Sequence, residues 1–257
     1  MAIYDCFPFF NELELLEMRM EILDKHVDYF VIQECNKTFQ GKDKPLYFLE
    51  NKDRYKKFQH KIIHSIFIDD MGTKWNNWDR DMNHRNHISD ALIRCQDDDI
   101  ILTSDADEIP NFDQNPISKI YDPNQIVHMM QRMYYYYLNV LKEENWFGTK
   151  ICAYRYFKNS SFDKVRNSKN IGIRIAEGGW HFTFIGGIEN VKTKIESWGH
   201  QEFNNDFIKN NIEDNIKNNR DIFYRPDSVF RTVPIDNSFP KYLIDNLSMY
   251  SQYIRSL

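Results

Sequence analysis

The sequence contains no apolar run that approaches the ~18 residues of a membrane-spanning helix. Its first residues also lack the charged segment and the long apolar core of a secretory signal peptide. The cysteines have no paired spacing, so they fit neither a zinc site nor a disulfide framework; they are Cys6, Cys35, Cys95 and Cys152. These absences predict a soluble chain with free thiols, in the cytoplasm or in another reducing compartment.

Blocks of basic charge are absent as well. Lys and Arg number 33 against 38 Asp and Glu, and the net charge of -5 weighs against nucleic acid as a bulk partner. No linker, internal repeat or low-complexity tract divides the 257 residues, which predicts a single domain. Aromatic residues, by contrast, are abundant at 15%, enough to build a core and still line a pocket.

The most informative stretch is 100–110, where a short apolar run ends in Asp105, Asp107 and Glu108 before Pro110 stops the strand. In an open α/β sheet, ligands bind beyond the carboxyl ends of the strands. Two carboxylates two residues apart at such an end can face one cation, and oxygen ligands suit Mg²⁺ or Mn²⁺ shared with a phosphate. An isolated Asp-x-Asp also occurs in solvated loops, so the rest of the chain must decide between the two interpretations.

The first half of the chain has the pattern of a parallel sheet. Residues 2–6, 27–33 and 61–68 are predicted strands, and a helix is predicted from 75 to 95. Between the first two strands, Asn11 and Glu14 have the spacing of a capping box, which predicts a helix with Asn11 as its N-cap. Strand, helix and strand in this order form the opening unit of an α/β fold.

The second half is predicted to hold longer, partly exposed antiparallel strands, at 126–130, 134–141, 150–157 and 171–176. If 134–141 is a strand, its run of four tyrosines alternates between the two faces, and the outward pair is free to stack on a sugar ring. A short helix is predicted after Gly186 and Gly187, and two more at 206–218 and 241–255.

Blocks 5–17, 41–48, 104–110 and 178–181 resemble glycosyltransferase family 17. The resemblance implies a GT-A fold, in which a nucleotide-sugar-binding α/β sheet merges with an antiparallel acceptor-side part. It also implies a UDP-sugar donor, with UDP-GlcNAc favoured, a Mn²⁺ or Mg²⁺ ion, a glycan acceptor and inversion at the anomeric carbon. On this basis the domain divides into a nucleotide-binding half at 1–110, an acceptor-side half at 111–205 and C-terminal helices at 206–257.

The resemblance implies how the donor is bound. Asp107 would hold the metal, and Asp105 would hold it directly or through water, or would instead reach the ribose. The expected contacts to the uridine, ribose or phosphates come from Asn11, Glu12, Glu34, Arg80 and Arg85. A helix cap is the alternative role for Asn11, and surface salt bridges are the alternative for the two arginines.

An inverting transfer needs a general base for the acceptor hydroxyl. The expected order of preference is Glu177, beside a glycine pair that leaves room for a sugar, then Glu108 and Glu202. A surface position at the end of a strand is the competing interpretation of Glu177.

Other expected site residues are aromatic rings and histidines. Trp180 and Tyr135 are expected to stack on the acceptor sugar, and His181 or His200 to add a metal ligand. A structural or exposed histidine is the commoner situation for each of the two.

Three other classes of protein remain open. A phosphotransferase with a nucleophilic Asp105 would need Ser or Thr two residues after Asp107, where this chain has Ile109. A sugar-binding module or inactive transferase would also be rich in aromatic residues, but the carboxylates suited to proton transfer argue against it. A scaffold without a ligand would not gather acidic residues at the end of one strand.

Overall fold

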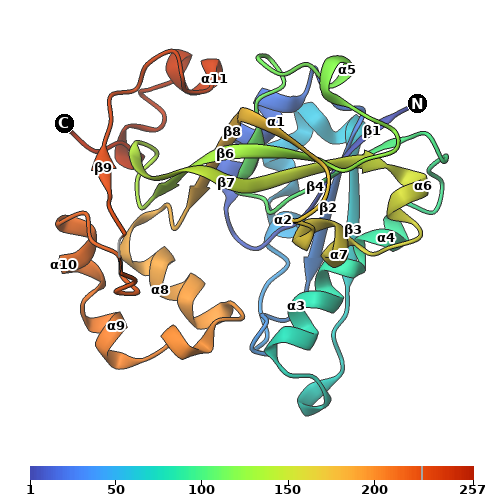
Figure 1. Ribbon diagram of the computed structural model, residues 1–257. Helices are drawn as coiled ribbons and strands as arrows, with labels where there is room; N and C mark the ends of the chain where they lie inside the picture. The colour runs from blue at the N-terminus through green and yellow to red at the C-terminus, as the bar shows by residue number, and fades with distance from the viewer. Residues whose placement is uncertain (227) are drawn as a thin grey trace.

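The computed structural model describes residues 1–226 and 228–257, which form a nine-stranded sheet with helices packed against it (Figure 1). The strands are β1 (Ile3–Pro8), β2 (Tyr29–Cys35), β3 (Ile62–Phe67), β4 (Ile100–Thr103), β5 (Glu108–Pro110), β6 (Val127–Tyr135), β7 (Val140–Ala153), β8 (Ile173–Thr183) and β9 (Arg231–Thr232). Their spatial order is β3-β2-β1-β4-β7-β6-β8-β5, and β9 pairs with β7.

Most helices are short. The α-helices are α1 (Leu13–Leu23), α2 (Tyr47–Asn51), α3 (Asn77–Asn86), α4 (Ile88–Ala91), α5 (Ile117–Ile120), α6 (Tyr154–Phe157), α7 (Phe162–Asn167), α8 (Gly187–Ser197), α9 (Asp206–Asn210), α10 (Ile212–Lys217) and α11 (Lys241–Asp245). The 3-10 helices are η1 (Lys52–Lys61), η2 (Gly72–Lys74), η3 (Gln201–Phe203) and η4 (Ser251–Tyr253). None of the helices in the described part of the chain combines the length and the apolarity that crossing a bilayer requires.

The first four strands in the sheet order are parallel, which confirms the predicted α/β class. β1 pairs with β2 and with β4, and β2 pairs with β3, all in the same direction. Cys6 of β1 is the register partner of Thr103 of β4, so the segments after these two strands leave the sheet side by side. This shared edge lies where parallel sheets bind their ligands.

Alternate residues of these strands enter two different cores, so helices cover both faces of the sheet. Phe7 packs in the same cluster as Leu16 of α1. Its neighbour Cys6 packs on the opposite face, with Ile88 of α4 and Phe162 of α7.

The second half of the sheet is mixed. β7 is antiparallel to both β4 and β6, whereas β8 is parallel to β6 and antiparallel to β5. The pairing of β5 with β8 places His181 opposite Glu108. This pairing brings His181, which is distant in sequence, beside the acidic loop that follows β4.

The predicted strand at 134–141 is wrong, because the chain turns between β6 and β7. Tyr136 has a φ of 67°, a left-handed conformation that ends the strand. Its hydroxyl donates to the carbonyl of Arg220 at 3.0 Å, which fixes the turn in a second hydrophobic cluster. Tyr134, Tyr135 and Tyr136 are all buried, so the expected alternation of inward and outward rings is absent.

Several predicted boundaries also shift. The strand at 150–157 ends at Ala153 and continues as α6, while the strand at 171–176 extends through the glycine pair to Thr183. The helices predicted at 75–95, 206–218 and 241–255 are each broken into shorter pieces.

Asn11 does not cap α1, contrary to the capping-box prediction. Glu12 occupies the N-cap position, and its side chain makes no capping hydrogen bond. The Glu12 carboxylate instead accepts the backbone N–H of Asn11 at 3.1 Å. Asn11 and Glu12 follow the carboxyl end of β1, at the edge of the sheet where a ligand is expected.

Candidate active site

A buried arginine on α1 holds the acidic loop that follows β4. Arg19 forms a two-pronged ion pair with Asp5 of β1, at 2.8 and 2.6 Å. It also donates to the hydroxyl of Ser104 at 2.6 Å and to the backbone carbonyls of Asp105 and Glu108 at 3.1 and 2.7 Å. Because one fully buried guanidinium satisfies so many loop acceptors, the loop has one defined backbone path.

Asp105 lies between two arginines. Arg85 of α3 and Arg166 of α7 both donate to its carboxylate, and its backbone N–H donates to Glu108 at 3.0 Å. Burial alone would raise the pKa of the Asp105 carboxyl, but the charges of Arg166 and Arg85 outweigh it and lower that pKa below its ordinary value. Asp105 is therefore an anion with its charge compensated by protein groups.

Asp107 is held by a different pair of groups. The Nε2 atom of His181 lies 3.3 Å from its Oδ1, and the ammonium of Lys194 lies 2.9 Å from its Oδ2. Burial opposes ionisation of Asp107, but Lys194 and His181 lower its pKa well below the ordinary value. Asp105 and Asp107 thus leave the same loop toward separate partners.

Glu108 supports this loop from within. Its Oε2 accepts the Asp105 N–H, its Oε1 accepts the indole N–H of Trp146 at 2.7 Å, and its side chain is buried. Both oxygens of Glu108 are thus engaged by groups of the protein, and its side chain holds the acidic loop.

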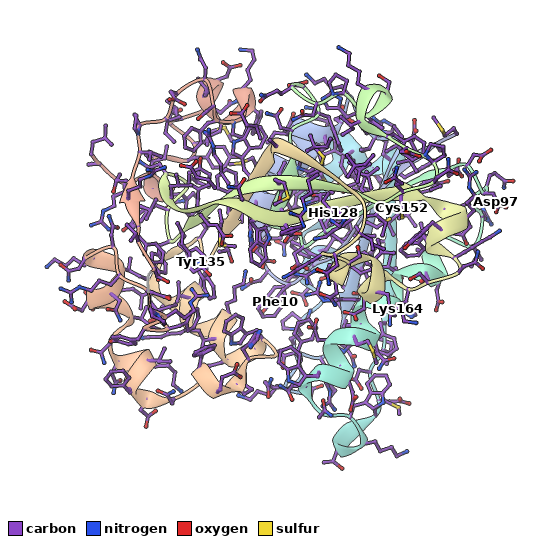
Figure 2. The ribbon with its side chains drawn as sticks, viewed as in Figure 1. Phe10, Asp97, His128, Tyr135, Cys152 and Lys164 are labelled. Atoms are coloured by element: carbon purple, nitrogen blue, oxygen red, sulfur yellow. The ribbon has the colours of Figure 1, made fainter. Side chains whose placement is uncertain are left out.

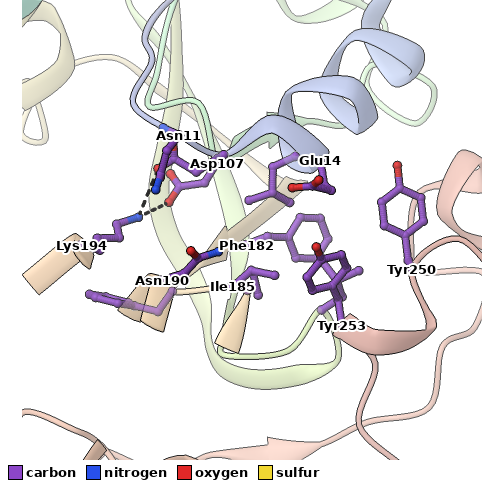
Figure 3. Close-up of a pocket in the computed structure, with 14 residues that line it drawn as sticks. Asn11, Glu14, Asp107, Phe182, Ile185, Asn190, Lys194, Tyr250 and Tyr253 are labelled. Carbon is purple, nitrogen blue, oxygen red and sulfur yellow. Dashed lines mark hydrogen bonds and ion pairs between the residues drawn. The ribbon is translucent and has the colours of Figure 1, made fainter. Parts of the chain in front are cut away.

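A pocket opens beside Asp107, between α1, β8, α8 and the C-terminal segment (Figure 3). The polar residues that line it are Asn11, Glu12, Glu14, Asp107, Asn190 and Lys194. The apolar part of the lining includes Phe182, Phe184, Tyr250 and Tyr253. Lys194 points at Asp107 across this space, as the dashed lines of Figure 3 show.

Glu12 is the pocket carboxylate that lies next to the Asp107–Lys194 pair. Its Oε1 is 3.9 Å from the Lys194 ammonium, while its Oε2 accepts the N–H of Asn11. Burial raises the pKa of Glu12 above its ordinary value, although the nearby charge of Lys194 lowers it in part. Glu12 is largely enclosed, with 19% of its side chain accessible, and a carboxylate with a raised pKa in a pocket is typical of a functional group.

His181 is the expected histidine that the fold brings to Asp107, whereas His200 is placed elsewhere. His200 and Glu202 are both exposed and pair with each other at 2.7 Å. The predicted base Glu177 lies on an exposed part of β8, with 61% of its side chain accessible, and accepts a hydrogen bond from Gln114 at 2.6 Å. The structure does not bring these three residues into the pocket beside Asp107.

The two aromatic rings expected to stack on an acceptor are buried. The Trp180 indole N–H donates to the carbonyl of Ser238 at 2.9 Å within the main core. Tyr135 packs between Phe184 and Phe230, at the end of β6 that faces the C-terminal helices (Figure 2). Neither ring is an open platform for a sugar, because both are buried. Trp180 was predicted from the glycine pair beside it, and Tyr135 from the alternation of a strand.

Two residues expected at the nucleotide have structural partners. Glu34 is buried at the N-terminus of α2, where it accepts the N–H groups of Phe48 and Leu49 at 2.8 and 3.0 Å. Arg80 pairs with Asp69 at 2.9 Å and lines a separate, open cavity of about 740 Å³ beyond β2 and β3. Arg85 is the one of the two predicted arginines that contacts the acidic loop.

Sequence reasoning missed three cations of the site. Lys194 was recognised only as part of a helix, and Arg166 had no signal, because its contact with Asp105 depends on how α7 packs. Arg19 did have a signal in the sequence. It lies three residues after Leu16 and four before Leu23, within the apolar stripe of α1. A charged residue in such a stripe is expected to be buried with a partner.

The metal-binding capacity of the site is limited to few protein ligands. Across residues 1–226 and 228–257, no three His, Cys, Asp or Glu side chains gather in the arrangement of a metal centre. Asp107 and His181 lie together as a pair, and the Nδ1 atom of His181 is buried without a hydrogen-bond partner in this part of the chain. Ions such as Mg²⁺ commonly use one or two protein ligands and take the rest from water and substrate phosphates. The pair fits that mode.

Sequence comparison finds similarity to known proteins at two levels. The human and rat proteins named β-1,4-mannosyl-glycoprotein 4-β-N-acetylglucosaminyltransferase are each 32% identical to the chain over 120 residues. The alignment covers 44% of this chain and only 22% of the length of each relative. The family model described as Glycosyltransferase family 17 matches residues 1–255. Because that match spans nearly the entire sequence, the chain belongs to glycosyltransferase family 17.

Proposed function

We propose that the protein transfers N-acetylglucosamine from UDP-GlcNAc to a hydroxyl of a glycan acceptor, with inversion to a β-linkage. The family supports the transferase class, and the name of the two relatives supports this donor sugar and a glycan acceptor. The acidic loop after β4 supports a donor site at the carboxyl edge of the parallel strands, where open α/β sheets bind their ligands.

The observation that carries the proposal is Asp107, buried at the edge of a pocket and flanked by His181 and Lys194. Asp107 and His181 would hold a divalent cation that a diphosphate also ligates. Such an ion supplies positive charge to a departing nucleoside diphosphate. Asp105, Arg85 and Arg166 keep the adjacent loop charged and ordered, so the donor meets a site formed in advance.

We assign proton transfer from the acceptor hydroxyl to Glu12. It lines the same pocket as Asp107, and burial raises its pKa toward the range in which a carboxylate is an efficient base. The three glutamates predicted for this role are engaged by the loop or lie outside the pocket. Glu12 was predicted to contact the uridine, so this assignment changes its role.

The test is release of UDP from a panel of nucleotide sugars, with Mn²⁺ and with EDTA. Wild-type protein should release UDP from UDP-GlcNAc only with the metal, and Asp107→Asn should lower the rate by at least about a hundredfold, as loss of a preorganised charge does. Asp113→Asn is the matched control, because this exposed aspartate pairs with Lys25 away from the pocket. Turnover unaffected by EDTA or by Asp107→Asn would contradict the proposal.

A further inference from the structure

We infer that Lys194 binds the diphosphate of the donor, and that it reaches the diphosphate by leaving Asp107 when a divalent cation binds there. The inference rests on the proposed function and adds a residue to its donor site. In the structure the Lys194 ammonium lies 2.9 Å from Asp107, 3.2 Å from the hydroxyl of Thr183 and 3.9 Å from Glu12 (Figure 3).

The Lys194 ammonium lies between two carboxylates at the wall of the pocket. One ammonium serves two carboxylates, Asp107 and Glu12, and close contact is made with only one of them. Its side chain remains 26% accessible at the pocket wall, whereas the Asp107 side chain is almost completely covered. The ammonium can therefore reach a ligand in the pocket without any opening of the core.

The helix that carries Lys194 is anchored independently of it. Val191 and Ile195 of α8 are fully buried in the second hydrophobic cluster. The Lys194 stem passes the ring of Phe184, with the ammonium 5.2 Å from the ring centroid. Rotation of the four-carbon side chain moves the charge across the pocket while the helix stays in place.

Charge favours the exchange. A divalent cation held by Asp107 and His181 would lie beside the ammonium that pairs with the other oxygen of Asp107 at 2.9 Å, and like charges repel in a buried site. The diphosphate of a bound donor would supply anionic oxygens for the Lys194 ammonium in place of Asp107. The nucleoside diphosphate gains negative charge as the bond to the sugar breaks, so its contact with Lys194 strengthens during the reaction.

The experiment compares Lys194→Met and Lys194→Arg with Lys192→Met. Lys192 is on the same helix but is exposed and pairs with Glu189 at 3.0 Å, so it provides the matched control. Three quantities are measured for each folded protein: the affinity for Mn²⁺ alone, the affinity for UDP in the presence of Mn²⁺, and the rate of UDP release from the donor. Thermal melting establishes that each variant is folded.

Lys194→Met should bind Mn²⁺ alone several-fold more tightly, because the competing ammonium is gone from Asp107. Its affinity for UDP with Mn²⁺ should fall about tenfold, the loss expected for one charge-assisted hydrogen bond. Its kcat should fall further than its donor affinity, whereas Lys194→Arg should keep most of the UDP affinity and Lys192→Met should match wild type.

Two results would overturn the inference, and they are distinguishable. In the first, wild type binds UDP in the presence of Mn²⁺, and Lys194→Met has the wild-type affinity for Mn²⁺ and for UDP. Lys194 is then only a structural partner of Asp107, and the proposed function stands. If wild type binds no UDP at any Mn²⁺ concentration, the proposed function fails and this inference fails with it.

Discussion

At the scale of single residues, Glu12 and Glu14 show how neighbouring carboxylates acquire different roles. Both line the pocket, but Glu14 is partly exposed and pairs with Arg54 at 3.1 Å. Glu12 is more enclosed, and it faces Lys194. The difference comes from the start of α1, which directs one side chain inward and the other along the surface.

Glu12→Gln should lower kcat by about a hundredfold or more, because an amide cannot accept the acceptor proton. The affinity for UDP with Mn²⁺ should change little, since the amide keeps the size and the polarity of the side chain. Steady-state kinetics and UDP titration separate the two effects, with Glu17→Gln as the control that retains wild-type kcat, because Glu17 pairs with Arg54 at 2.6 Å outside the pocket lining. A Glu12→Gln enzyme with unchanged kcat would remove Glu12 from the mechanism.

The acidic residues of the site and Arg85 were accessible from sequence, whereas Arg166 and Lys194 were not. Asp105 and Asp107 are marked by the strand before them and by the proline after them, which are local signals. Arg166 and Lys194 reach the same loop from α7 and α8, and nothing in their own neighbourhood indicates it. Ion pairs that depend on the packing of distant elements leave no local pattern.

At the scale of elements, the glycine pair in β8 permits the strand pairing that brings His181 to Asp107. Gly179 has a φ of +136° and lies opposite Pro110 of β5. A Cβ atom at this position would come within 2.1 Å of the backbone carbonyl of Ile109. The pair was interpreted as a turn that makes room for a sugar, but it is a close approach between two strands.

Gly179→Ala should therefore destabilise the protein by about 2 to 4 kcal/mol, through backbone strain and displacement of β5. Gly187→Ala is the control, because its φ of +82° is also left-handed but its Cβ would have open space around it. We expect about 1 kcal/mol for that variant. Urea unfolding measures both, and equal losses would contradict the role assigned to the close approach.

Helices and strands that carry a regular apolar pattern could be predicted from the sequence. Elements whose conformation depends on contacts with distant parts of the chain could not. The parallel strands and α1 follow from apolar patterns of the right length, and their order gave the α/β class. The turn at Tyr136 could not be found in the same way, because a hydrogen bond to Arg220 stabilises it. Four tyrosines in a row are equally compatible with a strand until that partner is known.

At the scale of the whole molecule, the C-terminal segment returns to the pocket formed by the first helix. The N–H of Leu138 donates to Tyr253 at 2.8 Å, and Tyr253 and Tyr250 line the pocket. Asn139 is buried and fastens the segment by donating to the carbonyls of Val233 and Arg255 at 3.1 and 2.8 Å. It also accepts the N–H of Arg255 at 2.8 Å.

Asn139→Ala should cost about 2 to 3 kcal/mol of stability, because it leaves buried backbone groups without partners. It should also weaken substrate binding, since the pocket wall at Tyr250 and Tyr253 loses its anchor. Thermal unfolding and donor KM measure the two effects. Asn159→Ala is the control, because it removes only an exposed hydrogen bond to the carbonyl of Arg155, and it should change neither the stability nor the KM. If Asn139→Ala had the same stability and KM as this control, Asn139 would not anchor the C-terminal segment.

The contacts of Arg19 join the folding of the protein to the formation of its site. They connect α1 with β1 and with the loop after β4, segments that are far apart in the sequence. The buried guanidinium has a complete set of partners only when α1 is packed on the sheet and the loop is in place. Packing of the core and ordering of the acidic loop therefore stabilise one another through this one side chain.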